Sequence, residues 1–242
     1  MSHAIQAAKP SCMKPIHWAI AGSLTLAVAS IGWSAFHPVT TRCTAYIPTD
    51  QPLIAHAGGG MPDATYTNSV AALNLAYRHG FRYFELDFLY RNGLVVGRSD
   101  ERLGDSLADV VAWFEANEDA ILVTDLKNGN QHLSLIAEKF GTTRVIPQIY
   151  HPSEYAAASA LGFSEIIFTA YRMPTGSEGN QQWRDAVNAL DLWAVTIPKD
   201  RIELADGVRH PVFLHTVNSP ISGFGLYTDC LIPADTKGPP QP

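Results

Sequence analysis

Residues 53–60 read Leu-Ile-Ala-His-Ala-Gly-Gly-Gly, and residues 82–88 read Arg-Tyr-Phe-Glu-Leu-Asp-Phe. The first stretch is a short apolar run that enters a glycine loop, which predicts a buried strand with His56 at its C-terminal end. Between the two stretches, apolar residues recur every three to four positions from Ser69 to His79, and Gly80 follows as a C-cap. The sequence therefore predicts a strand, a helix and a second strand.

The second strand carries two acidic residues at alternate positions. Because side chains alternate across a strand, Glu85 and Asp87 are expected on one face, and Phe84, Leu86 and Phe88 on the other. Two adjacent carboxylates repel each other, and a hard cation with oxygen ligands, Ca²⁺ or Mg²⁺, relieves that repulsion. The alternative is a solvated edge strand, which is disfavoured because the aromatic residues are typical of a buried one.

The same alternation of short apolar strands and amphipathic helices continues to the end of the chain. Strands are expected to begin at Leu53, Tyr83, Ala120, Val145, Glu165, Leu192, Val212 and Gly225. Helical segments are expected at residues 106–117, 131–140, 153–161, 181–190 and 201–207. This order predicts an α/β protein with the (β/α)8 TIM-barrel fold and reactive groups at the C-terminal ends of the strands. The barrel is expected to be trimmed after Asp100 and between Asn218 and Gly225, where few residues remain for a helix.

Several short motifs occur in an order that resembles the glycerophosphodiester phosphodiesterase family, within the phosphatidylinositol phospholipase C-like phosphodiesterases. They are His56-Ala57-Gly58, Thr67-Asn68-Ser69, Glu85-Leu86-Asp87, Ser99-Asp100, Asp125-Leu126-Lys127, His215-Thr216-Val217-Asn218 and Thr228-Asp229. The resemblance runs from about Leu53 to Leu231 and implies a metal-dependent phosphoric diester hydrolase in lipid metabolism, acting on glycerophosphodiesters or lipid headgroups.

The resemblance also implies roles for individual residues. Glu85, Asp87 and Asp125 would hold the divalent cation, Lys127 would place a charge against the phosphate, and His56 would transfer a proton. The alternatives are an ordinary surface pair for Asp125 and Lys127, and a structural hydrogen-bonding role for His56.

The chain departs from the family pattern at two positions. Ser99 stands where the family has its second histidine, and Ala57 stands where the family has an arginine. Arg98 is a candidate to bind phosphate in its place, and Asn68 and Ser99 are further candidates for contacting the substrate.

A substitute proton donor is expected at another strand end. His215, where the family has a tryptophan, is the first candidate, and His151 and Tyr171 follow. Two alternatives stay open: a barrel that binds a phosphorylated ligand or an envelope partner without hydrolysing it, and a metal-dependent amidohydrolase. The latter is disfavoured because no His-x-His pair ends the first strand.

The 242-residue chain has room for one barrel and an N-terminal extension. Its net charge of −6 and its lack of a basic, aromatic-rich cluster argue against nucleic acid as a partner. The expected organisation is a cytoplasmic segment (1–17), a membrane anchor or signal segment (18–36), the barrel (50–232) and a proline-rich disordered tail (233–242). The segment from Trp18 to Phe36 carries no charge and no clear cleavage site follows it, so an anchored, exported domain is expected, with a cleaved signal peptide as the alternative. Outside the cytoplasm Cys43 and Cys230 could form a disulfide, or both could stay free. The oligomeric state is not predicted.

Overall fold

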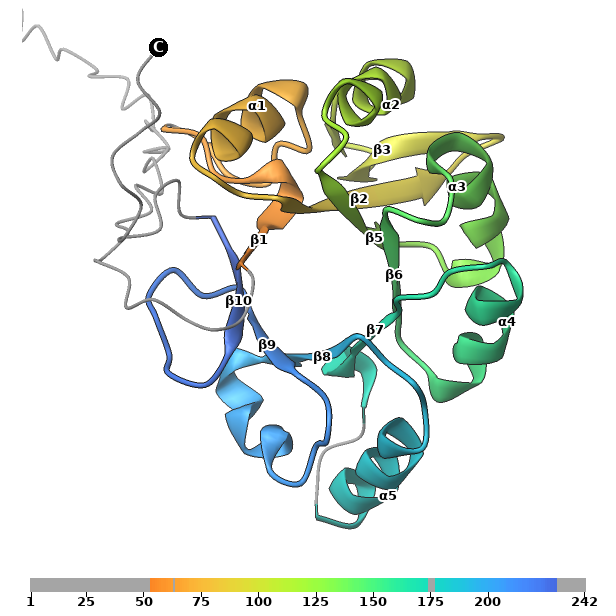
Figure 1. Ribbon diagram of the computed structural model, residues 1–242, viewed down its shortest axis with the longest axis vertical. Coiled ribbons are helices and arrows are strands. Elements are labelled where there is room, and N and C mark those ends of the chain that lie inside the picture. The colour runs from red at the N-terminus through yellow and green to blue at the C-terminus, as the bar shows by residue number, and fades with distance from the viewer. Residues whose placement is uncertain (1–52, 63, 174–176, 230–242) are drawn as a thin grey trace, which may run out of the picture. The chain divides into compact units, whose positions relative to one another are not determined.

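Eight parallel strands close into a ring in the computed structural model, which describes residues 53–62, 64–173 and 177–229. The ring closes because β1 (Leu53–Ala55) pairs in parallel with both β2 (Tyr83–Tyr90) and β10 (Gly225–Thr228). The remaining strands of the ring are β5 (Ile121–Leu126), β6 (Val145–Ile149), β7 (Ile167–Thr169), β8 (Ala194–Pro198) and β9 (Val212–His215). Helices surround this ring (Figure 1). The predicted (β/α)8 barrel is confirmed, and every expected strand lies within two residues of its predicted start.

A hairpin absent from the predicted strand order extends β2. β3 (Leu94–Ser99) pairs antiparallel with the end of β2, and β4 (Arg102–Leu103) pairs antiparallel with β3. Asn92 (φ 52°) and Gly93 (φ 153°) turn the chain between β2 and β3, in the region that favours these two residue types. The hairpin matters because it carries Arg98 and Ser99.

The helices lie outside the ring, as their apolar faces require (Figure 1). They are α1 (Val70–Arg78), α2 (Leu107–Ala116), α3 (Leu133–Phe140), α4 (Tyr155–Ala160) and α5 (Ser177–Asn188). Ser69 and Ser106 begin α1 and α2 by accepting a backbone N–H three residues on, which satisfies a free donor of the first turn. After β8 a 3-10 segment (Lys199–Ala205) replaces an α-helix, and residues 216–224 between β9 and β10 contain no helix. The expected trimming after β9 is therefore confirmed.

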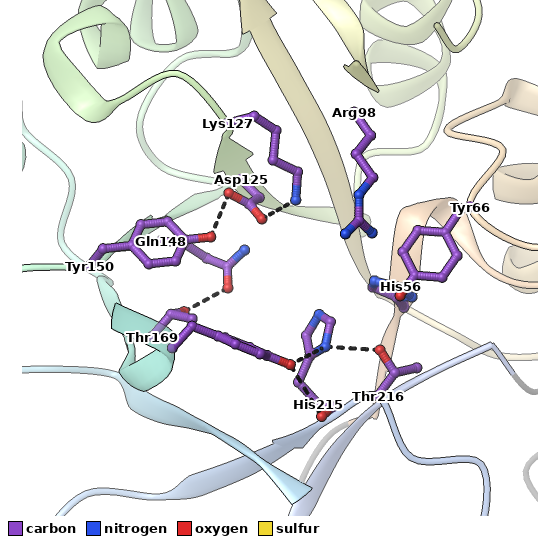
Figure 2. A pocket seen from close by; sticks show the side chains of 11 residues that line it. His56, Tyr66, Arg98, Asp125, Lys127, Gln148, Tyr150, Thr169, His215 and Thr216 are labelled. Atoms are coloured by element: carbon purple, nitrogen blue, oxygen red, sulfur yellow. Dashed lines mark hydrogen bonds and ion pairs between the residues drawn. The ribbon is translucent and has the colours of Figure 1, made fainter. Parts of the chain in front are cut away.

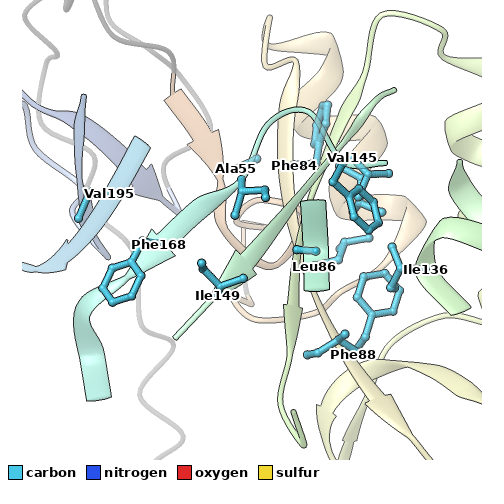
Figure 3. Close-up of a cluster of buried hydrophobic side chains, with 14 of the residues drawn as sticks. Ala55, Phe84, Leu86, Phe88, Ile136, Val145, Ile149, Phe168 and Val195 are labelled. Atoms are coloured by element: carbon cyan, nitrogen blue, oxygen red, sulfur yellow. The ribbon is translucent and has the colours of Figure 1, made fainter. Parts of the chain in front are cut away.

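Two apolar layers stabilise the barrel and leave its interior polar at the C-terminal ends of the strands. Outward-facing side chains such as Phe84, Leu86 and Phe88 pack against the helices, and Figure 3 shows part of this cluster. Inside the ring, below the polar end, lies a second apolar cluster. It consists of Ile54, Val123, Ile146, Ile167, Ala194, Phe213 and Tyr227. Glu85 and Asp87 face this interior, one and two layers above Tyr83, so the predicted division of the faces of β2 is confirmed.

Some predictions fall outside the described residues: the segment 18–36, its cleavage, the pairing of Cys43 with Cys230 and the tail 233–242. Among the residues that the structure does describe, none of the helices combines the length and the apolar character needed to cross a bilayer.

Candidate active site

Three buried carboxylates meet at the C-terminal end of β2 and β5. Glu85 and Asp87 project from β2, and Asp125 is the register partner of Asp87 on β5. Oxygen atoms from all three lie within 4.8 Å of one another, and the exposed fractions of these residues are 1 %, 0 % and 6 %. Like charges this close destabilise one another, so the group needs compensating positive charge.

Backbone and amide donors fix two of these carboxylates. The Ala57 N–H donates to Glu85 Oε2 (2.7 Å), and the Asn68 amide donates to Asp87 Oδ2 (3.0 Å). Asn68 Oδ1 also accepts the Asp87 N–H (2.8 Å). Both polar atoms of Asn68 are thus committed to Asp87 and its side chain does not line the cavity. The structure places it behind the carboxylates, as a residue that orients Asp87 and not as a contact for the substrate.

Lys127 supplies the positive charge in the absence of a cation. Its Nζ lies 2.5 Å from Asp87 Oδ1 and also forms an ion pair with Asp125 Oδ2. Burial alone would lower the pKa of Lys127, but the attraction of Asp125, Glu85 and Asp87 outweighs burial and holds the pKa above its usual value. Lys127 therefore stays charged at neutral pH, and it is no ordinary surface residue.

The carboxylate group fits a hard divalent cation. Burial, followed by the charge of Asp87, raises the pKa of Glu85 well above its usual range, and the attraction of Lys127 opposes this only in part. Tyr150 donates to Asp125 Oδ1 (2.7 Å) and so fixes the third carboxylate from outside the cluster. Three anionic oxygen ligands held by neutral donors are the set that Ca²⁺ or Mg²⁺ requires.

His56 lies beside these carboxylates and is held by a residue from the last strand. Its Nδ1 is 2.9 Å from Asp229 Oδ1, and its Nε2 is 4.0 Å from Glu85 Oε2. Asn218 accepts the Asp229 N–H (2.8 Å) and thereby fixes the end of β10. Gly60 packs directly on this end, since a Cβ added there would come within 2.0 Å of the Asp229 carbonyl oxygen. The glycine loop after His56 thus lets β10 approach the histidine.

His215 lies next to His56, where the sequence predicts a second imidazole. The ring centroids are 4.5 Å apart at 82°, and His215 Nδ1 is 2.9 Å from the Tyr171 hydroxyl and 2.8 Å from Thr216 Oγ1. Desolvation lowers the pKa of His215 well below its usual value, and His56, Lys127 and Arg98 add to the effect. The ring is therefore neutral at neutral pH, so it suits accepting a proton better than the predicted role of donating one.

These groups line one cavity of about 380 Å³ at the mouth of the barrel (Figure 2). Its walls are His56, Tyr66, Arg98, Asp125, Lys127, Gln148, Tyr150, Thr169, Tyr171, His215 and Thr216. In Figure 2 the second ring nitrogen of His215 points into this space, on the side of Lys127 and Arg98. The cavity thus presents two cations, two imidazoles and one of the three carboxylates to a ligand.

Arg98 and Ser99 are adjacent in sequence but do not share the cavity. Arg98 lines it and lies over the Tyr66 ring, 4.9 Å from Cζ to the ring centroid. Ser99 does not line it and pairs with Arg102 in the hairpin, because neighbouring residues of a strand face opposite sides. Of the two predicted substrate contacts on β3, the structure places only Arg98 at the site.

Of the two further candidates for a proton donor, the structure brings one to the site. Tyr171 reaches His215, whereas His151 is exposed, begins the 3-10 segment Pro152–Glu154 and does not line the cavity. Tyr66, Tyr150 and the carboxylate of Asp229 had no predicted role. Only Asp229 had a signal in the sequence, because it belongs to the motif on the last strand.

Comparison of the whole chain with known proteins agrees with the fold. A glycerophosphodiester phosphodiesterase from Thermotoga maritima is similar with a TM-score of 0.53 and 15 % identity, over 76 % of this chain and 97 % of that one. A glycerophosphoryl diester phosphodiesterase from Parabacteroides distasonis has a TM-score of 0.46 and 13 % identity, over 72 % and 75 %. No protein-family model and no curated protein matches the chain.

The fold and the carboxylate group together define a (β/α)8 barrel with a candidate site for a divalent cation at the C-terminal ends of its strands. The fold is the one found in the glycerophosphodiester phosphodiesterase of Thermotoga maritima, as the motifs predict.

Proposed function

We propose that this protein is a metal-dependent phosphoric diester hydrolase that acts on glycerophosphodiesters or lipid headgroups, and so takes part in lipid metabolism. One observation carries the proposal: the rings of His56 and His215 lie 4.5 Å apart beside the buried group Glu85, Asp87 and Asp125. Hydrolysis of a phosphodiester needs two proton transfers and neutralisation of the phosphate charge, and these residues supply the groups for both.

Two neighbouring positive charges bind the phosphate. Lys127 and Arg98 both line the cavity, and their charges face the nonbridging oxygens of a diester placed between them. Ca²⁺ or Mg²⁺, held by Glu85, Asp87 and Asp125, would neutralise charge on the same oxygens and lower the pKa of a bound water.

The two imidazoles divide the proton transfers. His215 is neutral and its Nε2 faces the cavity, so it takes the proton of the attacking water as that oxygen forms its bond to phosphorus. His56, which Asp229 holds through Nδ1, gives a proton to the alkoxide as the P–O bond to the alcohol breaks. Tyr171 and Thr216 hold His215, and Asp229 holds His56.

A leaving-group experiment tests this division on the full-length protein supplied with Ca²⁺ or Mg²⁺. Glycerophosphocholine and phosphatidylinositol test the proposed substrates, and a p-nitrophenyl phosphodiester serves as the activated comparison because its phenolate leaves without a proton. Replacing His56 by Ala should slow glycerophosphocholine hydrolysis by about 10²- to 10⁴-fold but affect the activated ester much less. Replacing His215 by Ala should slow both. No turnover of any of these diesters by the unsubstituted protein, with metal shown to bind, would reject the proposal.

A second function is favoured by the position of Lys127. Its ammonium already bridges Asp87 and Asp125, so a barrel that binds a phosphorylated ligand or an envelope partner without hydrolysis would be complete without metal. Retention of a phosphodiester by metal-free protein, without turnover after metal is added, would support this alternative. Replacing Ser99 by His would not restore a catalytic imidazole, because position 99 does not line the cavity.

We also propose that the barrel is exported and anchored through residues 18–36, with secretion after cleavage as the alternative. The support is the uncharged run in that segment, which is long enough for a span and is followed by no clear cleavage site. Fractionation of cells expressing the full chain, with protease added to intact cells, tests it: a barrel that stays protected and soluble would contradict both versions.

A further inference from the structure

We propose that the alcohol esterified to the phosphate carries a negative charge of its own, a carboxylate or a second phosphate, and that Arg172 recognises it. This inference rests on the proposed function and specifies its substrate class. It begins from the aromatic side chains of the cavity, which at first sight suit the quaternary ammonium of a choline headgroup.

Two of the three tyrosines that line the cavity are not available to bind such a cation, and the third, Tyr171, packs edge-on against His215. Tyr66 and Tyr150 both line the space, but each already has a guanidinium over its ring. Arg98 lies 4.9 Å from the centroid of Tyr66, and Arg172 lies 4.4 Å from that of Tyr150. A quaternary ammonium would have to displace an arginine from each ring and would meet the repulsion of its charge.

One of these two arginines, Arg172, supplies positive charge that the proposed chemistry does not use. Among the described residues, neither Arg98 nor Arg172 forms an ion pair with a carboxylate, whereas Lys127 forms two. Arg98 lies on the side of the cavity where Lys127 stands, so the phosphate that is cleaved accounts for it (Figure 2). The cleaved phosphate does not account for the charge of Arg172.

Arg172 is not itself a lining residue, but it borders the cavity because it lies over the ring of Tyr150, which lines it. It ends the 3-10 segment Ala170–Arg172, which directly follows β7 and therefore lies at the catalytic end of the barrel. The Tyr150 ring beneath it is anchored on Asp125, so the guanidinium is one side chain away from the carboxylate group. An exposed guanidinium at this distance can pair with two oxygens of a carboxylate or a phosphate.

The test compares diesters that share glycerol and differ in the second alcohol. Glycerophosphocholine carries a cation, glycerophosphoglycerol is neutral there, and glycerophosphoglycerol 3-phosphate carries a second phosphate. We expect the full-length protein with Mg²⁺ to show the highest kcat/KM for the last. Replacing Arg172 by Gln should lower that value about tenfold or more while changing the value for glycerophosphoglycerol less than about twofold.

Arg78 offers a matched control, because it is an exposed arginine at the end of α1, at the opposite end of the barrel. Arg78→Gln should leave all three values unchanged. A preference for glycerophosphocholine, or an equal effect of Arg172→Gln on all three diesters, would overturn the inference while leaving the hydrolase proposal intact.

If none of the three diesters is hydrolysed, their affinities measured by calorimetry test the inference independently of the hydrolase proposal. Tighter binding of glycerophosphoglycerol 3-phosphate that is lost in Arg172→Gln would support recognition of the second anion, although the hydrolase proposal would fail. Equal binding of all three compounds would overturn the inference.

Discussion

His56 and Asp229 are 173 positions apart in sequence, yet Nδ1 of one lies 2.9 Å from Oδ1 of the other. The contact exists because β1 and β10 are neighbours in the closed ring, with Ala55 opposite Thr228. Each of the two residues directly follows its strand. Closure of the barrel therefore fixes the orientation of the imidazole.

Replacing Asp229 by Asn should reduce kcat for an alkyl phosphodiester by about 10²-fold or more, because an amide keeps the size of the side chain but removes the carboxylate that orients His56 through Nδ1. KM should change little, since Asp229 does not line the cavity. Steady-state kinetics check the prediction, with Asp191→Asn, at an exposed position before β8, as the control. An unchanged kcat would show that His56 acts without its partner.

Replacing Asn68 by Ala should lower the free energy of unfolding by about 1–3 kcal/mol, because Asp87 loses two buried hydrogen bonds. Asn68 also has a φ of 49°, which alanine adopts less readily than asparagine. Urea unfolding of Asn68→Ala and Asn68→Gly separates the two causes, since glycine tolerates this φ. Asn74→Ala, which removes one bond to Trp113 on an exposed face of α1, should cost less. Equal loss in all three variants would contradict the importance of the contact with Asp87.

Replacing Glu85 by Gln should have opposite effects with and without metal. Without metal the protein should become more stable, because burial and the charge of Asp87 disfavour the ionised Glu85. With Ca²⁺ or Mg²⁺ in excess the unsubstituted protein should gain about 2.7 kcal/mol at a hundred times Kd, and the variant should gain much less. Thermal unfolding with and without each ion measures both effects, and Glu138→Gln on the exposed face of α3 is the control. A variant stabilised by metal as much as the original would place the ion elsewhere.

The neutral state of His215 predicts a dependence of stability on pH. Its pKa is lowered in the folded protein, whereas in the unfolded chain it returns to about 6.5. Below that value the unfolded chain binds a proton that the folded protein does not, so stability should fall as the pH drops below about 6.5, by at most about 1.4 kcal/mol per pH unit from this group.

Replacing His215 by Asn should make the dependence on pH shallower between pH 6.5 and 5, measured by urea unfolding at each pH. His56, Lys127 and Arg98 oppose the charged form of His215, so the effect belongs to the assembled site. His79→Asn, at the end of α1, is the control. An unchanged slope in the His215 variant would show that the ring takes up a proton in the folded protein.

Much of this architecture could be predicted from local pattern. The period of two along β2 assigned Glu85 and Asp87 to one face, and the spacing of apolar segments gave eight strands in order. The hairpin β3–β4 escaped prediction although Asn92-Gly93 is a strong turn signal, because Leu94–Ser99 was not read as a strand paired with β2. Without that pairing, Arg98 and Ser99 could not be assigned to opposite sides.

The partners within the site were harder to predict, because they depend on ring closure and on loop conformation. Nothing local indicates that Tyr171 would reach His215, or that Arg172 would cover Tyr150. The chain also uses Asn68 in a way that its motif does not reveal, since its amide is satisfied entirely by Asp87. Sequence spacing identified the groups of the site, and tertiary packing decided which of them face the cavity.

Because Asp87 pairs in register with Asp125, the candidate ion site depends on the correct register between β2 and β5. If β2 slipped by one residue against β5, Leu86 or Phe88 would enter the barrel at the level of Asp125, and the carboxylates of β2 would turn toward the helices. A chain with this shifted register could keep its helical content and much of its compactness. Tight binding of a divalent ion would then distinguish molecules with the correct strand register from the others in a refolded preparation.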